Sequence, residues 1–465
     1  MEHHSRLLLC GAAAMILGGS LAGAAGATTL SGVRAAATMQ APGNYRGPLG
    51  GAYTAPLAQR MLQSSTASWP QSYYDPGHTG YNPKEKTLSP SNVSALTLLG
   101  GPNTGCVPEA VVLNQGTLYT RHSGCGSIGG TLAAFDAVTF VQKWSATVGN
   151  WQGGNIETIA VGENRVMTGC ASTAGPGLCA YSASSGKLLW SYNPACSGCG
   201  QSLDTSLAYS NGVIYVFFNV NVFGPNYQYI QAIDVKTGNQ LWSNQIMYGY
   251  SGGLVVGGGY VYYVCSKSNY GNGMCALSQA NGGLVWSNFP QNGLGYGATA
   301  YSKGTVYVNS GCSEGCTPQV AAFNGQTGSL IWSNTSYGGS WQNPAVAKGV
   351  VYVPVSTGPS LIALSGATGA VRWADPETDQ SGPSVANGVV YTVTTLDSQH
   401  FATVAHRASN GQVLWSAANY RQGNLPPPII ANGTLYSPDN GPTCGVCAYG
   451  LTGMAPRSVP FARHR

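Results

Sequence analysis

Cysteine is the residue type with the clearest chemistry in this 465-residue chain, which contains 13 of them. Cys10 lies in an apolar N-terminal stretch, and the other twelve form pairs that are close together in the sequence. An even number of closely spaced cysteines is typical of disulfides in an oxidising compartment. The predicted pairs are Cys106–Cys125, Cys170–Cys179, Cys196–Cys199, Cys265–Cys275, Cys312–Cys316 and Cys444–Cys447. Short loops gain at most about 2–3 kcal/mol from closure, so the expected role of these disulfides is to hold loops in shape.

Zinc binding is the alternative chemistry for two of these pairs. Cys196 and Cys199 form a C-x-x-C motif, as do Cys444 and Cys447, and four thiolates would make a tetrahedral zinc site. Neither motif is followed by His, so the sequence does not support a covalently attached c-type haem. We favour disulfides, because the N-terminus has the character of an export signal.

Acidic residues that could act as bases or metal ligands are few and scattered. Those between the periodic segments are Glu157, Asp204, Asp375, Glu377 and Asp379, with Arg421 as a cation. His122, His400 and His406 share no metal-ligand spacing, and no Ser-His-Asp or paired-carboxylate pattern is evident. The sequence therefore predicts no catalytic residue and no metal site. Glu157, Asp204 and Arg421 are kept as candidate ligand-binding residues, with solvated loop charges as the alternative.

Aromatic residues recur between the periodic segments and could bind a flat apolar surface, such as a sugar or a cofactor ring. The candidate ligand-binding aromatics are Trp151, Tyr192, Tyr250, Tyr296, Trp341 and Tyr420. The alternative is that these side chains wedge between neighbouring repeats.

The elements that must position these residues come from a repeat. The segment 319–333, QVAAFNGQTGSLIWS, joins two apolar runs through a Thr-Gly turn and ends in Trp. Related segments end at Trp144, Trp190, Trp242, Trp286, Trp332, Trp373 and Trp415, spaced 41 to 52 residues apart. Alternating small and β-branched residues predict half-buried strands, and Gly supplies the positive φ of a tight hairpin turn. One hairpin cannot bury its own face, so the copies are expected to stack, with each Trp packed against the next repeat.

The repeats and the segment before them resemble a known family. Ala232, Asp234, Thr237, Gly238 and Trp242 match the repeat of β-propeller proteins built from pyrroloquinoline-quinone (PQQ)-type repeats. The preceding segment resembles their usual lead-in at Trp69, Asp75, His78-Thr79-Gly80, Tyr81, Asn82, Pro83 and Asn92-Val93. The resemblance covers about residues 69–454. It implies four-stranded blades in which this repeat is the outer hairpin, strands C and D, and a second motif supplies the inner strands A and B.

The number of blades follows from counting both motifs. Eight inner pairs are visible, but only seven outer hairpins end in Trp. Residues 94–100, SALTLLG, have the character of the missing outer strand, with Gly100 where the Trp would be. The predicted fold is therefore all-β, an eight-bladed β-propeller of four-stranded antiparallel blades whose last blade is closed by an N-terminal strand; the alternative is seven blades. Ring closure would remove exposed sheet edges.

The links between strands predict where binding occurs. A–B and C–D links are tight, whereas B–C and D–A links are long and lie on one face of a propeller. All twelve cysteines outside the N-terminal stretch fall in or beside these long links. Since functional residues concentrate on loops held by a rigid scaffold, this face is the predicted binding face.

Composition and the N-terminus predict export. Residues 1–27 resemble a signal peptide that ends in small residues, with a retained membrane anchor as the alternative. Residues 28–68 are expected to be a flexible low-complexity lead, and residues 69–465 a single propeller domain. Charged residues are only 8% of the chain and the net charge is +5, without a basic run, so nucleic-acid binding has no support. The expected location is extracytoplasmic or secreted.

The function expected from the sequence is that of a non-catalytic binding or scaffold protein, which engages a protein or carbohydrate partner on the loop face. The resemblance also implies an alternative, a PQQ- and calcium-dependent dehydrogenase. Such enzymes hold the quinone on the axis with a Trp platform, a calcium bound by Glu, Asn and Asp, an Asp base and often a disulfide between adjacent cysteines. This chain has no adjacent cysteines, and its acidic residues do not map onto that ligand set. A surface propeller that binds carbohydrate is the second alternative.

Overall fold

The structure is a computed structural model. It describes residues 68–105, 108–122, 130–149, 158–172, 175–193, 200–221, 226–246, 249–267, 271–291, 293–311, 317–340, 342–357, 361–375, 381–395, 400–420, 426–439 and 444–452. All of these belong to the compact unit formed by Thr54–Arg465. The predicted signal peptide and flexible lead, residues 1–67, lie outside the described part of the chain.

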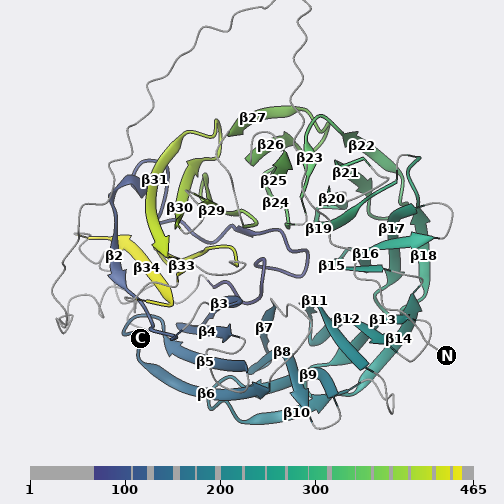
Figure 1. The fold of residues 1–465 in the computed structure, drawn as a ribbon, viewed down its shortest axis with the longest axis horizontal. Helices are drawn as coiled ribbons and strands as arrows, with labels where there is room; N and C mark the ends of the chain where they lie inside the picture. Colours follow the sequence, from purple (N-terminus) through teal and green to yellow (C-terminus); the bar gives the residue numbers. More distant parts are fainter. Residues whose placement is uncertain are drawn as a thin grey trace, which may run out of the picture. The chain divides into compact units, whose positions relative to one another are not determined.

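Eight antiparallel sheets form a ring, so the predicted eight-bladed propeller is confirmed and the seven-bladed alternative is wrong (Figure 1). Blades 1 to 4 comprise β3 (Ala110–Asn114), β4 (Thr117–His122), β5 (Gly130–Asp136) and β6 (Gln142–Gly149); β7 (Ile159–Gly162), β8 (Arg165–Ser172), β9 (Gly175–Ser182) and β10 (Leu188–Tyr192); β11 (Gly200–Ser210), β12 (Val213–Asn221), β13 (Asn226–Asp234) and β14 (Gln240–Ile246); and β15 (Gly249–Gly257), β16 (Tyr260–Lys267), β17 (Gly271–Ser278) and β18 (Leu284–Asn288).

The second half of the ring repeats this order. Blades 5 to 8 comprise β19 (Tyr296–Ser302), β20 (Thr305–Gly311), β21 (Gln319–Asn324) and β22 (Leu330–Asn334); β24 (Ala345–Ala347), β25 (Val350–Thr357), β26 (Leu361–Ser365) and β27 (Val371–Asp375), with β23 (Gly338–Gly339) beside β25; β28 (Ser384–Ala386), β29 (Val389–Thr395), β30 (His400–Arg407) and β31 (Val413–Tyr420), with β1 (Tyr81–Asn82) beside β28; and β32 (Ile429–Ala431), β33 (Thr434–Pro438), β34 (Val446–Leu451) and β2 (Leu96–Gly100). A short 3-10 helix, η1 (Val93–Ala95), precedes β2. No helix in the described ranges is long and apolar enough to span a membrane.

The repeated Trp joins each blade to the next. The indole nitrogen of Trp190 donates a hydrogen bond to the Val235 carbonyl at 2.9 Å, and Trp242 does the same to Gln279 at 3.0 Å. The indole ring also covers the turn glycine of the next blade: a Cβ added to Gly238 would lie 2.7 Å from the ring of Trp190. The same glycine has a φ of +75°, a backbone angle that residues other than glycine rarely adopt. The Thr-Gly turn is therefore required twice, once by the backbone and once by the neighbouring indole.

This double requirement predicts unequal costs for two Gly→Ala substitutions. Gly238→Ala should lower the free energy of unfolding by about 2–4 kcal/mol, because it adds a clash with the indole to the backbone strain. Gly212→Ala is the matched control, since Gly212 has a φ of +81° and no atom within 4 Å of its added Cβ; it should cost only the strain, about 1–2 kcal/mol. Urea denaturation measures both. Equal costs would contradict the role given to the indole.

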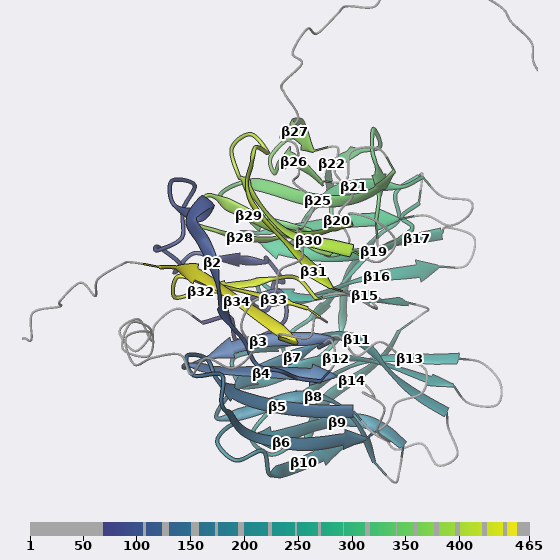
Figure 2. The same ribbon diagram turned by 60° about the vertical axis from the view of Figure 1, so that its left-hand side comes forward.

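The last blade is closed by β2, as predicted. β2 pairs with β34, with Gly100 opposite Ala448 in the same register that places Trp242 opposite Ala232. Figures 1 and 2 both show β2, from the start of the described chain, beside β34 from its end. The strand observed, Leu96–Gly100, is two residues shorter than predicted because Ser94 and Ala95 belong to η1.

A feature that the sequence did not indicate is an inner belt, defined here as residues 69–82. It hydrogen-bonds in order to the innermost strand of all eight blades, each time at or beside the strand's last residues. The bonds include Trp69 to Leu113, Pro70 to Val161, Gln71 to Tyr209, Pro76 to Val256, Gly77 to Tyr301, Thr79 to Val346, Gly80 to Val385 and Asn82 to Ile430. The lead-in runs through the middle of the ring in Figure 1. The belt thus hydrogen-bonds to the inner edges of the sheets at the end of the ring where the A–B turns lie. Residues 69–82 therefore occupy the centre of that face.

Two ionisable residues of the belt have opposite pKa shifts. Asp75 accepts hydrogen bonds from the backbone and hydroxyl of Thr79, but burial raises the pKa of its carboxyl to about 6. Burial lowers the pKa of the His78 imidazole to about 4, although that ring bonds to the Leu207 carbonyl. Asp75 therefore makes the protein less stable as the pH rises from about 4 to 6, whereas His78 makes it less stable as the pH falls from about 6.5 to 4.

Because these slopes oppose each other, their combined contribution to stability should be nearly constant between pH 4 and 6.5. In the His78→Gln variant only Asp75 still changes the stability over this range. The free energy of unfolding of this variant should therefore fall by roughly 2–3 kcal/mol as the pH rises. Asp75→Asn should show the reverse slope. Urea midpoints at pH 4.5 and 6.5 test both variants against the wild type. Unchanged slopes in the variants would mean that these groups titrate at their ordinary values.

Candidate functional site

The described disulfides lie at the predicted loop face. Cys170 on β8 is joined to Cys179 on β9, and Cys265 on β16 is joined to Cys275 on β17. Each bond therefore crosses from strand B to strand C at the base of a B–C link. Cys444 and Cys447 are also joined, so two of the four thiolates that the zinc alternative requires are not available. The predicted pairs Cys106–Cys125, Cys196–Cys199 and Cys312–Cys316 involve residues outside the described ranges.

Among the predicted ligand-binding aromatics, Tyr192 has described side-chain contacts. It ends β10, the outermost strand of blade 2, where its ring lies 6.0 Å from that of Phe218 in blade 3. Its hydroxyl donates to the Gln240 side chain at 2.6 Å. These contacts are those of a residue wedged between blades.

The other candidates are placed only in part. The backbones of Tyr250, Tyr296, Tyr420 and Asp204 lie in β15, β19, β31 and β11, respectively. Trp151, Glu157, Trp341 and Arg421 lie outside the described ranges, as do Glu377 and Asp379. Their role in ligand binding stays a prediction.

An ion pair that sequence reasoning missed lies at the loop-face end of blade 1. Arg121, near the end of β4, pairs with Glu109, which immediately precedes β3. The Arg121 side chain is 2% exposed, and burial lowers its pKa while the Glu109 charge opposes that change. The sequence signal that could have revealed this pair was a charged residue within an apolar strand, because a buried charge needs a partner. Removing one partner would leave the other charge buried and unpaired, which would lower the stability of the protein. The pair therefore has a structural role in blade 1.

A second polar group joins blades 6 and 7. Asp375 at the end of β27 lies 3.0 Å from His406 Nδ1, and His406 Nε2 lies 3.1 Å from the Thr392 hydroxyl. Asp375 and His406 are far apart in the sequence and meet because two blades pack together. A carboxylate, an imidazole and a hydroxyl in this order could activate a nucleophile. Thr392 and His406 are fully buried, however, so the described arrangement links the blades.

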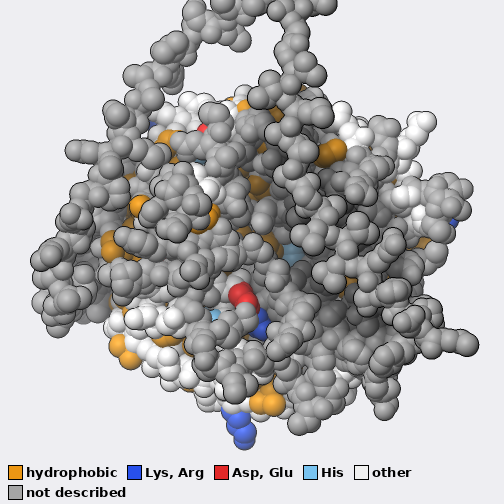
Figure 3. Space-filling model, viewed as in Figure 1, with side chains coloured by type: hydrophobic (Ala, Val, Ile, Leu, Met, Phe, Trp, Pro, Cys, Tyr) orange, Lys and Arg blue, Asp and Glu red, His pale blue; other side chains and the backbone are white. Residues whose placement is uncertain are grey.

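The described side chains assemble no calcium site, and the candidate acidic residues Glu157, Glu377 and Asp379 lie outside the described ranges. Calcium prefers six to eight oxygen ligands. In the described part of the chain, the one group of three potential metal-binding side chains is Asp439, Cys444 and Cys447, and two of these form a disulfide. The carboxylates of Glu109 and Asp375 contact Arg121 and His406 instead. Among the described side chains visible in Figure 3, an acidic and a basic group lie next to each other.

These features define the class of protein: an eight-bladed propeller whose blades are joined by repeated tryptophans. The family model described as outer membrane protein assembly factor BamB, made of PQQ-type repeats, matches residues 92–269 and 271–437. The chain belongs to this PQQ-like repeat family.

Two curated relatives match parts of the chain. A tetrathionate hydrolase from Acidithiobacillus ferrooxidans is 27% identical over 186 residues, covering 36% of this chain and 36% of the hydrolase. The dehydrogenase subunit of a quinone alcohol dehydrogenase from Gluconobacter oxydans is 28% identical over 160 residues, covering 33% of this chain and 16% of that protein. The matches therefore span well under half of either relative.

Solved structures share the fold. A quinohemoprotein alcohol dehydrogenase from Comamonas testosteroni has a TM-score of 0.62 and 14% identity, covering 88% of this chain and 86% of that one. BamB from Moraxella catarrhalis has a TM-score of 0.54 and 16% identity, covering 77% and 99%. At such identities the likeness extends to the propeller fold alone.

Proposed function

We propose that this protein is an exported, non-catalytic propeller that binds a partner protein through its loop face. The observation that carries the proposal is the difference between the two faces. At the A–B turn end, residues 69–82 already occupy the inner strand edges of every blade. At the other end, disulfides hold the bases of B–C links, and loops that are ordered before binding lose less entropy when a partner arrives.

The use of the described charges supports a binding role. Glu109, Arg121, Asp375 and His406 are engaged in contacts within or between blades. Such groups stiffen the scaffold and leave recognition to the loops. Membership in a family described by an outer-membrane assembly factor points the same way, and disulfides suit a location outside the cytoplasm.

A dehydrogenase that uses PQQ and calcium is the second candidate, favoured by the partial match to a quinone alcohol dehydrogenase subunit. The two candidates separate in one experiment. The purified protein is mixed with PQQ and calcium, desalted, and examined for a retained quinone absorbance. Retained stoichiometric quinone would replace the binding proposal with the dehydrogenase. A glycan array distinguishes the carbohydrate-binding alternative.

Binding through the loop face is tested by photo-crosslinking in the producing cells. A photoreactive amino acid at position 151 or 341 should give a defined protein adduct, because both positions lie in D–A links. The control position is 236, in the β13–β14 turn of the opposite face, where Lys236 is exposed. Trp151→Ala and Trp341→Ala should each weaken capture of that adduct partner by roughly 1–3 kcal/mol if they are anchors. Adducts at position 236 alone would contradict the proposal.

A further inference from the structure

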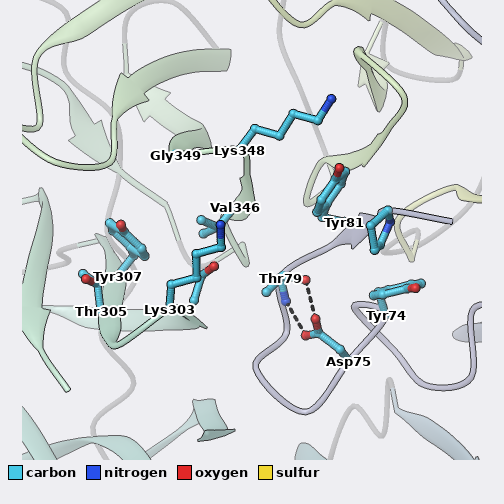
Figure 4. Close-up of a pocket in the computed structure, with 12 residues that line it drawn as sticks. Tyr74, Asp75, Thr79, Tyr81, Lys303, Thr305, Tyr307, Val346, Lys348 and Gly349 are labelled. Atoms are coloured by element: carbon cyan, nitrogen blue, oxygen red, sulfur yellow. Dashed lines mark hydrogen bonds between the residues drawn. The ribbon is translucent and has the colours of Figure 1, made fainter. Parts of the chain in front are cut away.

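A cavity lies on the face opposite the disulfides, beside the inner belt. Its volume is about 470 Å³, and it opens between blades 5 and 6. Lys303 comes from the β19–β20 turn and Lys348 from the β24–β25 turn. The belt and β1 supply Tyr74, Asp75 and Tyr81 to the lining. Figure 4 shows Lys303 on one side of the cavity and the rings of Tyr74 and Tyr81 on the other.

The two lysines occupy the first position of their A–B turns. Lys303 has a φ of +49° and Lys348 a φ of +50°. The equivalent position has a similar positive φ at Asn211, Asn387 and Asn432, and also at Gln115 and Glu163. Asparagine tolerates this left-handed conformation better than lysine does, so the turn itself does not require lysine.

The charges around the cavity are unbalanced. Both lysines are exposed, and neither forms an ion pair with any residue in the described ranges. The one carboxylate in the lining, Asp75, accepts hydrogen bonds from the backbone of Thr79 at 3.0 Å and from its hydroxyl at 2.7 Å. Figure 4 shows this carboxylate turned toward Thr79. Two ammonium groups are thus left to attract an anion.

Aromatic rings form much of the cavity wall. Tyr307 is fixed in place because its hydroxyl donates to the Gly366 carbonyl at 3.3 Å, and Tyr74 packs edge-on against Trp69 with ring centroids 5.1 Å apart. Burial and the Asp75 charge raise the pKa of Tyr74 to about 12, so its hydroxyl stays protonated and can donate a hydrogen bond. Val346 and Pro83 add apolar surface to the lining.

We propose that this cavity binds a small organic anion with a flat apolar body. Lys303 and Lys348 take the carboxylate, sulfonate or phosphate group, and the tyrosine rings take the body. The site lies on the opposite face from the partner-binding loops, so it is independent of the proposed function.

The test uses 2-naphthoate as the probe and isothermal titration of the full mature chain at low ionic strength. One molecule should bind per chain. The double variant Lys303→Asn/Lys348→Asn should bind about tenfold or more weakly, equivalent to about 1.4 kcal/mol. Asparagine already fits this turn elsewhere in the ring, so the variant should fold and melt at least as well as the wild type. Lys236→Asn, remote from the cavity, should bind normally.

Four further measurements separate the proposal from its alternatives. Neutral 2-naphthylmethanol should bind about tenfold more weakly than 2-naphthoate, and Tyr81→Ala should weaken binding of the naphthoate. Added salt should weaken it further, because exposed charges are screened. Equal binding by the neutral analogue or by the double lysine variant would overturn the proposal. Competition by inorganic sulfate as strong as that by naphthoate would overturn the role of the tyrosines.

Discussion

Deleting residues 28–83 is expected to abolish folding at 37 °C, whereas deleting residues 28–67 is expected to be tolerated. The longer deletion removes the inner belt and leaves backbone groups of eight inner strands without their partners. Each lost hydrogen bond to a buried group costs about 1–3 kcal/mol, and the fully buried Trp69 adds about 3–5 kcal/mol. The total, about 11–29 kcal/mol, equals or exceeds the 5–15 kcal/mol by which domains are usually stable.

Circular dichroism and size-exclusion chromatography of the two truncated chains measure this result. A third chain that lacks residues 28–100 also loses β2, so blade 8 should expose a sheet edge and aggregate. A soluble, monomeric chain of residues 101–465 with unchanged melting would refute both the belt and the strand closure.

The second large effect concerns an exchange of residues where the ring closes. Blade 8 has Gly100 where the other blades have Trp, and blade 1 has Phe140 where the next turns have Gly. The two substitutions compensate, because a Cβ added to Gly100 would lie 3.5 Å from the Phe140 ring. Gly100→Trp alone should cost about 3–5 kcal/mol, since it places a large residue against Phe140 and at a φ of +121°. Phe140→Gly alone should cost only about 1 kcal/mol, because the lost packing is partly offset by relief of the φ of +59° at this position.

The double variant Gly100→Trp/Phe140→Gly should recover most of the stability lost in Gly100→Trp. It restores the Trp-over-Gly contact seen between Trp190 and Gly238, so the coupling free energy should exceed about 1.5 kcal/mol. Urea denaturation of the four proteins gives this value. Additive costs would show that Phe140 does not fill the space of the missing Trp.

The two faces of the ring follow from the same construction. A–B turns are tight and adopt positive φ, with Asn at this position in blades 3, 7 and 8, Lys in blades 5 and 6, and Gln115 and Glu163 in blades 1 and 2. The described B–C disulfides lie beside short links, because the strands of blades 2 and 4 continue to residues 172 and 267 and resume at residues 175 and 271. A partner on the loop face and a small anion beside the belt would therefore use surfaces that the fold keeps separate.

The sequence by itself determined the repeat, the number of blades and the closing strand. These features depend on local patterns: alternating apolar residues, a Thr-Gly turn and a Trp at a fixed offset, which pairing within one blade converts directly into structure. Gly100 in the Trp position was readable for the same reason.

Only the tertiary structure decided which distant residues meet. The lead-in carries no strand periodicity, so nothing local showed that it pairs with eight inner edges. His406 met Asp375, and Lys303 came to line the same cavity as Lys348, because neighbouring blades pack at a fixed angle around a common axis. Contacts of this kind depend on ring geometry rather than on spacing along the chain, and a single sequence does not encode them in a local pattern.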